Sequence, residues 1–132
     1  MEVKDARVLI VDDQVMIRSM LIEILGEIGV KDVEEVEDGK AALERMKEIR
    51  SNGEEMHVIF LDWNMPEMTG YEFLMEIQNQ DLMGDTKIVM QTTESESEKV
   101  MKALMAGVDD YVVKPYLAEQ IVKKFTGIVT KL

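Results

Sequence analysis

The sequence lacks cysteine altogether and contains one histidine among its 132 residues. Without cysteine the chain can form no disulfide, no thiolate nucleophile and no cysteine-ligated zinc or iron–sulfur site. The single histidine, His57, also excludes a metal centre built from several imidazole ligands. These absences remove disulfide-stabilised folds and most zinc chemistry from consideration.

Long apolar runs and basic charge are scarce as well. The longest unbroken apolar runs, at 8–11 and 58–61, have four residues each, whereas about 20 are needed to span a bilayer. The N-terminus has no basic segment followed by an apolar one, as a secretory signal would. With 15 basic residues against 27 acidic ones, the net charge is −12, which argues against nucleic acid as the main partner and favours cations or basic protein surfaces. We therefore expect a cytoplasmic protein that does not insert into a membrane.

The length and composition fit one compact domain. Domains of roughly 100–150 residues are the commonest size, and a chain of 132 residues is long enough to bury a core without covalent staples. The hydrophobic fraction of 46% is ordinary for a globular protein. We predict a single domain over residues 1–132 with no attached output domain.

Two apolar patterns alternate along the chain. Short apolar runs predict buried strands, and apolar residues spaced three and four apart predict amphipathic helices. The predicted strands cover 6–11, 33–36, 56–61, 87–91 and 111–113. The predicted helices cover 14–28, 39 to a turn at 51–53, 70 to a stop before Gly84, 95–106 and 118–131. Strands and helices in strict alternation imply an α/β fold with a parallel sheet between two layers of helices.

Polar residues follow four of these strands. Asp12 and Asp13 follow the first strand, Asp62 the third, Thr92 the fourth and Lys114 the fifth. In an open parallel sheet, ligands bind beyond the carboxyl ends of the strands. Three carboxylates, a hydroxyl and an ammonium group are therefore expected at one edge of the sheet.

Each of these residues also has an ordinary structural interpretation. Asp12 or Asp13 could cap the following helix, and Asp62 could begin an Asx-turn. Taken together, however, three neighbouring carboxylates repel one another, which raises their pKa values unless a cation offsets the charge. An all-oxygen acidic site suits Mg²⁺ or Mn²⁺, and a hard cation beside a hydroxyl and an ammonium group suits a phosphoryl group.

Two further polar features precede strands and are expected at the opposite edge. Asp109 and Asp110 repeat the acidic pair, but they come before the fifth strand. We predict that they form a solvated turn. His57 precedes the third strand and is expected to be a surface residue.

The strand-end motifs resemble the receiver domain of two-component response regulators. They are Asp12-Asp13, Asp62-Trp63-Asn64-Met65-Pro66, Thr92 and Tyr111-Val112-Val113-Lys114-Pro115. The resemblance covers essentially the whole chain and is nearest to the CheY-like single-domain chemotaxis regulators. It implies a flavodoxin-like (βα)5 sandwich with strand order 2-1-3-4-5, an order that periodicity alone does not give.

The resemblance also implies roles for the acidic residues. Asp62 would be the nucleophile that accepts a phosphoryl group from a phosphohistidine on a CheA-like histidine kinase. Asp13, Asp62 and the backbone carbonyl of Asn64 would hold Mg²⁺ or Mn²⁺, with Asp12 acting through a bound water. Asn64 would also tune access of the hydrolytic water, together with Glu94.

Three residues would sense the phosphoryl group. Lys114 would pair with one phosphoryl oxygen, and with a carboxylate before transfer, while Thr92 would bond another oxygen. Tyr111 would then move inward behind Thr92. The partner-binding face would comprise the helix at 95–106, the strand at 111–113 and the last helix. In this family the peptide bond between Lys114 and Pro115 is commonly cis.

Two features depart from the family pattern. Thr93 occupies a position where a small residue is usual, which would crowd the mouth of the site. The segment 94–98 reads Glu-Ser-Glu-Ser-Glu, whereas enteric chemotaxis regulators carry lysines there. The acidic segment indicates either a partner of different charge or simple complementarity with the helix dipole.

Three functional hypotheses follow. The first is a phosphorylation switch that binds a flagellar switch protein, or another target that recognises the phosphorylated form, with a phosphatase as a further partner. The second is a phosphorelay intermediate that passes its phosphoryl group to another histidine. The third is a small flavodoxin-type or phosphohydrolase enzyme. The third fits poorly for two reasons. The loop after the first strand is acidic, which does not suit the phosphate-binding loop of a flavodoxin. The two acids of that loop are adjacent, whereas a phosphohydrolase with an aspartate nucleophile would have them in an Asp-x-Asp motif. We expect no enzymatic activity beyond phosphorylation and dephosphorylation of Asp62 itself.

Overall fold

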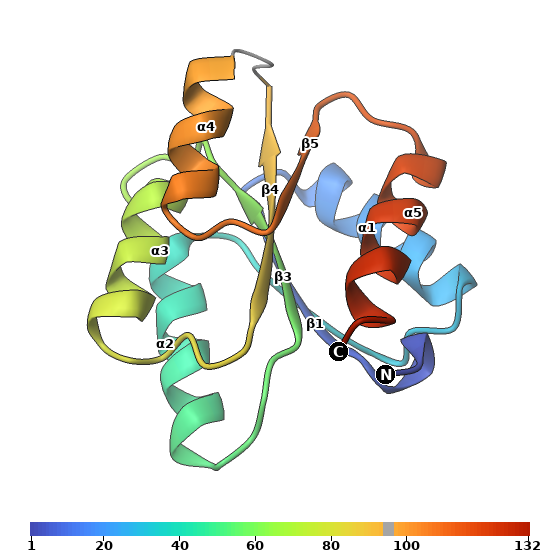
Figure 1. The fold of residues 1–132 in the computed structure, drawn as a ribbon, viewed down its shortest axis with the longest axis horizontal. Coiled ribbons are helices and arrows are strands. Elements are labelled where there is room, and N and C mark those ends of the chain that lie inside the picture. The colour runs from blue at the N-terminus through green and yellow to red at the C-terminus, as the bar shows by residue number, and fades with distance from the viewer. Residues whose placement is uncertain (94–96) are drawn as a thin grey trace.

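A computed structural model describes residues 1–93 and 97–132 (Figure 1). The strands are β1 (Arg7–Val11), β2 (Asp32–Val36), β3 (Val58–Asp62), β4 (Lys87–Thr92) and β5 (Asp110–Val113). The helices are α1 (Val15–Glu27), α2 (Gly39–Ser51), α3 (Gly70–Asn79), α4 (Ser97–Met105) and α5 (Ala118–Val129), after a short 3-10 helix at Val3–Asp5. All pairings are parallel and the order is β2-β1-β3-β4-β5. The predicted flavodoxin-like fold and its strand order are confirmed.

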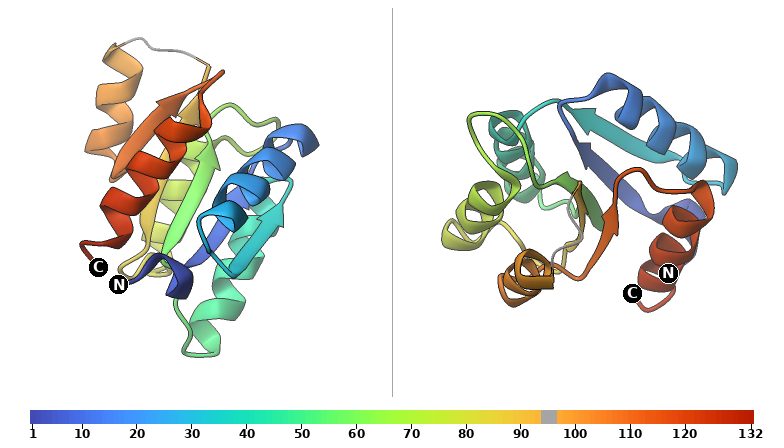
Figure 2. Two further views of the ribbon diagram at one scale, coloured as in Figure 1. Left: turned by 90° about the vertical axis from the view of Figure 1, so that its right-hand side faces the viewer. Right: turned by 90° about the horizontal axis from the view of Figure 1, so that it is seen from above.

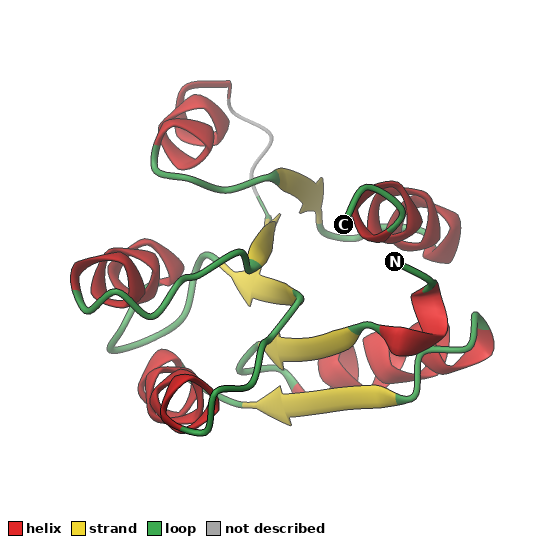
Figure 3. Cartoon of the chain, turned by 60° about the horizontal axis from the view of Figure 1, so that its bottom comes forward, coloured by secondary structure: helices red, strands yellow, loops and turns green. Residues whose placement is uncertain are grey.

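The sheet lies between two layers of helices (Figure 2; Figure 3). Helices α2, α3 and α4 cover one face, and α1 and α5 cover the other (Figure 1). Because side chains alternate along a strand, Leu9 and Val11 of β1 join the core under the first layer while Val8 and Ile10 join the core under the second. The central strand β3 is buried at every position, which explains its continuous apolar sequence.

The edge strand β2 shows why its apolar signal is weak. Its acidic residues lie partly exposed at the rim of the sheet and pair with arginines of neighbouring elements. Glu34 bonds the guanidinium of Arg45 at 2.6 Å, and Glu35 bonds that of Arg18 at 2.8 Å. Val33 and Val36 alone give a weak strand signal. The pairing of every residue of β2 with β1 holds this strand in the sheet.

The predicted bounds hold to within a few residues where the sequence specifies them. The end of α3 is predicted only to lie before Gly84, and the structure places it at Asn79. Asp81 adopts a positive φ of 56°, and the Leu82 N–H closes the turn on the Ile77 carbonyl at 2.7 Å. The turn after Asn79, and not Gly84, therefore ends the helix.

The residues that precede β3 and β5 lie at the opposite edge from the strand-end acids, as predicted, but they are not simply solvated. Asp109 accepts the N–H of Ile88 at 2.8 Å, and Asp110 pairs with Lys124 at 2.8 Å. His57 has 19% of its side chain exposed, and its Nδ1 accepts the N–H of Arg7 at 2.8 Å. The turn at Asp109 is exposed, as predicted, although both aspartates also bond or pair with groups at the edge of the sheet. His57 is only partly at the surface, because its ring also accepts a backbone N–H.

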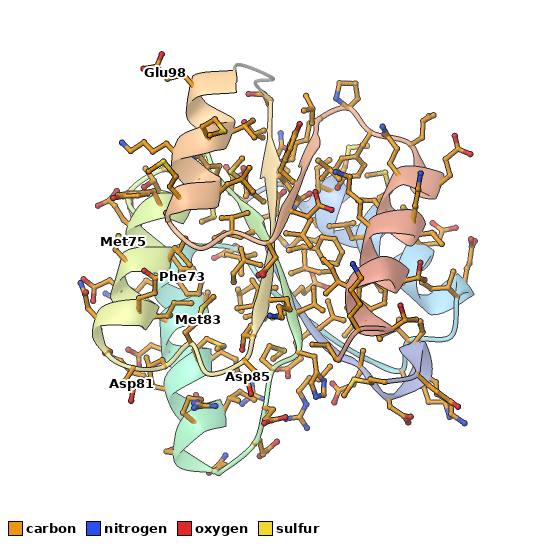
Figure 4. The ribbon with its side chains drawn as sticks, in the orientation of Figure 1. Phe73, Met75, Asp81, Met83, Asp85 and Glu98 are labelled. Atoms are coloured by element: carbon orange, nitrogen blue, oxygen red, sulfur yellow. The ribbon has the colours of Figure 1, made fainter. Side chains whose placement is uncertain are left out.

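Acidic residues occupy both ends of the molecule. Figure 4 shows Glu98 at the start of α4, and Asp81 and Asp85 at the other end, in the connection from α3 to β4.

In the part of the chain that the structure describes, no helix combines the length and apolar character needed to cross a bilayer.

Candidate functional site

The carboxyl ends of β1 and β3 bring three aspartates together. Val11 of β1 pairs with Leu61 of β3, so the next residue of each strand, Asp12 and Asp62, meet at the same edge. Asp12 and Asp62 are buried, whereas Asp13 is exposed. Carboxylate oxygens of all three aspartates lie within 4.8 Å of one another. The predicted convergence of these acids is confirmed.

Lys114 enters this group from beyond β5. Its Nζ lies 2.8 Å from Asp12 Oδ2 and 3.6 Å from Asp62 Oδ2, and only 9% of the side chain is exposed. The same ammonium lies 3.3 Å from Gln14 Oε1. Asp12 is thus the closer carboxylate partner of Lys114. One ammonium group against three carboxylates leaves an excess of negative charge at the site.

The loops hold one oxygen of each buried carboxylate. Asp12 Oδ1 accepts the N–H of Gln14 at 2.8 Å, and Asp62 Oδ1 accepts the N–H of Asn64 at 3.1 Å. These are Asx-type turns, so the Asx-turn interpretation of Asp62 is also correct, whereas helix α1 has Gln14 at its N-cap and receives no side-chain cap from Asp12 or Asp13. The turns leave the second oxygen of each carboxylate, Oδ2, facing the ammonium of Lys114.

The pKa of Asp62 is raised to about 6. Burial is the largest cause, and the charge of Asp12 and a hydrogen bond with Asp13 act in the same direction. The charge of Lys114 and the hydrogen bond from the Asn64 N–H lower the pKa, but do not outweigh burial. At neutral pH Asp62 is therefore mostly ionised, at a cost in free energy that a cation would relieve.

The donor set fits a hard divalent cation. Three carboxylates within 4.8 Å of one another, one of them with a raised pKa, offer the oxygen ligands and the negative charge that Mg²⁺ or Mn²⁺ prefers. Asn64, the fourth predicted ligand, follows Asp62 in the same exposed loop. No nitrogen or sulfur ligand accompanies this cluster among the described residues, which disfavours zinc.

Gly70 allows α3 to begin against this site. A Cβ at position 70 would lie 2.6 Å from the Asp62 carbonyl oxygen and 2.9 Å from the Cα of Trp63, so only glycine fits without moving the backbone. A capping box fixes the start of the helix, because the hydroxyl of Thr69 accepts the N–H of Glu72 and the carboxylate of Glu72 accepts the N–H of Thr69, both at 3.1 Å. The Thr-Gly pair marks the helix start in the sequence, but the close approach to Asp62 is visible only in the structure.

Trp63 connects the acidic site with the α3 and α4 layer. Its half-buried ring meets Tyr71 edge to face, with centroids 6.0 Å apart, and Lys102 of α4 lies 5.0 Å above the ring of Tyr71. The Trp63 N–H donates to the Gln91 carbonyl at 2.9 Å. The indole is thus held by packing and by its backbone next to Asp62.

The remaining predicted residues lie on or beside the last two strands. Thr92 is buried at the end of β4, and its carbonyl accepts the N–H of Lys114 at 2.7 Å. Tyr111 is half-buried in β5, with the ammonium of Lys124 4.7 Å above its ring. Thr93 is exposed, and the Lys114–Pro115 peptide bond is cis, as the resemblance implies. Glu94 lies outside the described residues.

One buried polar pair beside the site has no counterpart in the sequence patterns. The hydroxyl of Tyr116 donates to Oε1 of Gln91 at 2.6 Å, and Gln91 is completely buried. Gln91 was predicted only as a strand residue, and Tyr116 as part of the loop after Pro115. Neither lies in a local motif that would have distinguished it.

Comparisons with known proteins agree with this geometry. The sequence model of the family described as "Response regulator receiver domain" matches residues 8–126. A chemotaxis protein CheY homolog from Campylobacter jejuni is 33% identical over 123 residues, which cover 93% of this chain and 92% of that protein. The solved structure of Vibrio cholerae chemotaxis protein CheY4 is 36% identical with a TM-score of 0.81, over 93% of this chain and 98% of that one. A CheY-like receiver domain from Methanospirillum hungatei is 28% identical with a TM-score of 0.79, over 96% of this chain and 98% of that one.

Proposed function

Because the chain belongs to the response regulator receiver domain family, we propose that it is a phosphorylation switch in which Asp62 accepts a phosphoryl group from a histidine kinase. The observation that carries the proposal is the group formed by Asp12, Asp13, Asp62 and Lys114 at the carboxyl edge of the sheet. A nucleophilic carboxylate, oxygen ligands for a cation and an ammonium group are the parts that phosphoryl transfer to a carboxylate requires.

The proposed transfer forms one bond and breaks one. A carboxylate oxygen of Asp62 attacks the phosphorus of a phosphohistidine, the P–N bond breaks, and the imidazole nitrogen keeps the electron pair. The product is an acyl phosphate on Asp62. A divalent cation held by Asp13, Asp62 and the Asn64 carbonyl, with Asp12 acting through water, would neutralise charge on the phosphoryl oxygens.

Three residues of this chain would respond to the product. The ammonium of Lys114, already 3.6 Å from Asp62, would pair with one phosphoryl oxygen and the hydroxyl of Thr92 would bond another. Tyr111 would follow Thr92 inward and change the face formed by α4, β5 and α5. Asn64 and Glu94 would control access of the water that hydrolyses the acyl phosphate.

The output is protein binding, and control of a flagellar motor in chemotaxis is the proposed setting. The supporting observations are the Campylobacter and Vibrio relatives, both named as chemotaxis proteins, and three exposed apolar side chains on α4, those of Met101, Leu104 and Met105. A receiver domain is typically a signalling protein and not an enzyme. The expected partners are a CheA-like kinase, a flagellar switch protein and a phosphatase.

A phosphorelay role uses the same site and stays the second candidate. Val15 and Met16 at the start of α1 and Leu117 before α5 are exposed apolar residues, and the preceding residues Gln14 and Lys114 contact each other through their side chains. A protein that presents a histidine to Asp62 could pack on these side chains in either role. Binding of a purified switch protein and of a histidine phosphotransfer protein, each with and without beryllofluoride, would separate the two roles.

The first test uses Trp63, the only tryptophan. It directly follows Asp62 and its ring packs on Tyr71, so we expect a saturable change in its emission when Mg²⁺ is added. Beryllofluoride should cause a second change only in the presence of the metal, because both additions alter the charge beside the indole. A second change without any divalent ion, or selective binding of zinc, would contradict the proposal.

The second test removes one ligand charge at Asp13. Asp13→Asn should weaken Mg²⁺ binding by at least about tenfold, and should slow labelling of Asp62 by a small acyl-phosphate donor at subsaturating Mg²⁺. Asp85→Asn is the matched control, because Asp85 is an exposed aspartate at the opposite end of the molecule (Figure 4). Equal Mg²⁺ affinity in the two variants would remove Asp13 from the metal site.

A further inference from the structure

Gln91 is a buried polar residue for which the proposed chemistry has no use. It lies in β4, in register with Asp62 of β3 and Val112 of β5, and none of its surface is exposed. Strand alternation places its side chain on the same face as Val89, in the apolar core under α1 and α5. An amide in such a place costs free energy that an apolar side chain would not, unless it is hydrogen-bonded.

Its hydrogen bonds are only half satisfied by protein. Oε1 accepts the hydroxyl of Tyr116 at 2.6 Å, while Nε2 is buried and has no hydrogen-bond partner among the described residues. Burial and the charges of Asp12 and Asp62 raise the pKa of Tyr116, so the phenol keeps its proton and remains a donor. The pair is therefore a neutral link between β4 and the loop that follows β5.

The link lies next to the residue that contacts the acids. Lys114 is two positions before Tyr116, and its own N–H donates to the carbonyl of Thr92 at 2.7 Å. The segment 114–116 is thus tied to the end of β4 at two points, one on each side of Pro115. The first tie is backbone to backbone, and the second is the bond from Tyr116 to Gln91.

We propose that Gln91 and Tyr116 are positioning residues that hold the ammonium of Lys114 at Asp12 and Asp62. The inference rests on the proposed function, because it assigns the pair to the residue that would assist phosphoryl transfer. Without the second tie, the bond between the Lys114 N–H and the Thr92 carbonyl is the tie to β4 that remains among those described above. The ammonium then spends less time within reach of Asp62, and a small misplacement of a reacting group is costly in rate.

The test is a mutant cycle with Lys114, in which the initial rate of Asp62 labelling by acetyl phosphate is measured at saturating Mg²⁺. Tyr116→Phe removes one hydroxyl and keeps the ring, and should slow labelling about three- to tenfold. In a Lys114→Ala background the same change should have no effect, because no ammonium remains to be positioned. Effects that multiply in the double variant would overturn the inference.

A double variant separates positioning from stability. Gln91→Leu combined with Tyr116→Phe replaces the buried polar pair with an apolar one. Compared with Tyr116→Phe alone, the unfolding midpoint should therefore recover to at least that of the wild type. Labelling should remain slow, because the tie is still absent. Recovery of the labelling rate together with stability would show a merely structural role and overturn the inference.

The control for loss of a phenol is Tyr71→Phe, which removes a hydroxyl from α3 and keeps the ring against Trp63. It should label at the wild-type rate. The outcomes also distinguish the two proposals. If the wild type is not labelled at Asp62, the proposed function fails; if it is labelled and Tyr116→Phe is labelled equally fast, only the positioning role fails.

Discussion

Replacing Asp62 with asparagine is expected to abolish labelling by acetyl phosphate, because an amide oxygen is too weak a nucleophile to form the acyl phosphate. The loss should be complete within the detection limit of mass spectrometry on the intact protein. Asp85→Asn should label normally, since Asp85 is exposed and lies at the other end of the molecule (Figure 4). A label that persists in Asp62→Asn and resists hydroxylamine would show that the acceptor is another residue.

The same variant should be more stable than the wild type at neutral pH. The pKa of Asp62 is about 6 in the folded protein, against an ordinary value of 3.8, so between these values the folded state binds more protons than the unfolded state. The contribution of Asp62 to the stability of the wild type therefore falls as pH rises through this interval, by up to about 3 kcal/mol. Asparagine does not titrate, retains an oxygen that can accept the Asn64 N–H, and leaves Lys114 paired with Asp12.

Urea unfolding without divalent ions checks this sign. The gain of Asp62→Asn over the wild type should be largest at pH 7 and should shrink steadily toward pH 4, where Asp62 is protonated in the folded state and is close to its ordinary pKa of 3.8 in the unfolded state. Mg²⁺ should narrow the gap at pH 7, because the metal stabilises only the ionised carboxylate. An equal gain at both pH values would contradict the raised pKa.

Replacing Lys114 with alanine is the second change with a large expected effect. Lys114 lies 2.8 Å from the fully buried carboxylate of Asp12, and removing one partner of a buried ion pair typically costs about 3–5 kcal/mol. The loss should be measured by urea unfolding without divalent ions, and Mg²⁺ should recover more stability in this variant than in the wild type. Lys87→Ala is the matched control, because its ammonium is 3.9 Å from Asp109 and 39% of the side chain is exposed. Its loss should be at most about 1 kcal/mol.

Lys114→Ala should also separate the chemistry from the signal. The charge of Lys114 lowers the pKa of Asp62, so the pKa of Asp62 should be still higher in the variant. The variant should therefore label slowly, most of all near pH 6. Labelling should recover as the pH rises, because the carboxylate then ionises without help. The labelled variant should nevertheless fail to bind its target, since the ammonium no longer connects Asp62 with β5. Normal binding by the phosphorylated variant would contradict this role for Lys114.

Much of this protein follows from local sequence. The alternation of apolar patterns determines five strands and five helices, because a strand buried on both faces must be continuously apolar and a surface helix must carry an apolar stripe. The carboxyl ends of parallel strands lie at one edge of the sheet, so the position of Asp12, Asp13, Asp62, Thr92 and Lys114 after strands is enough to predict that they share this edge. The acidic site could therefore be predicted without knowledge of any distance.

Only the tertiary structure decided which of these residues touch and what supports them. Lys114 and Asp12 are 102 residues apart, and their 2.8 Å contact depends on the sheet order and on the length of both loops. The bond between Gln91 and Tyr116, and the acceptor role of His57, likewise join elements that no periodicity relates. Local patterns determine where a strand ends and which face is apolar, whereas hydrogen bonds between distant side chains depend on register and loop conformation, which the assembled fold sets.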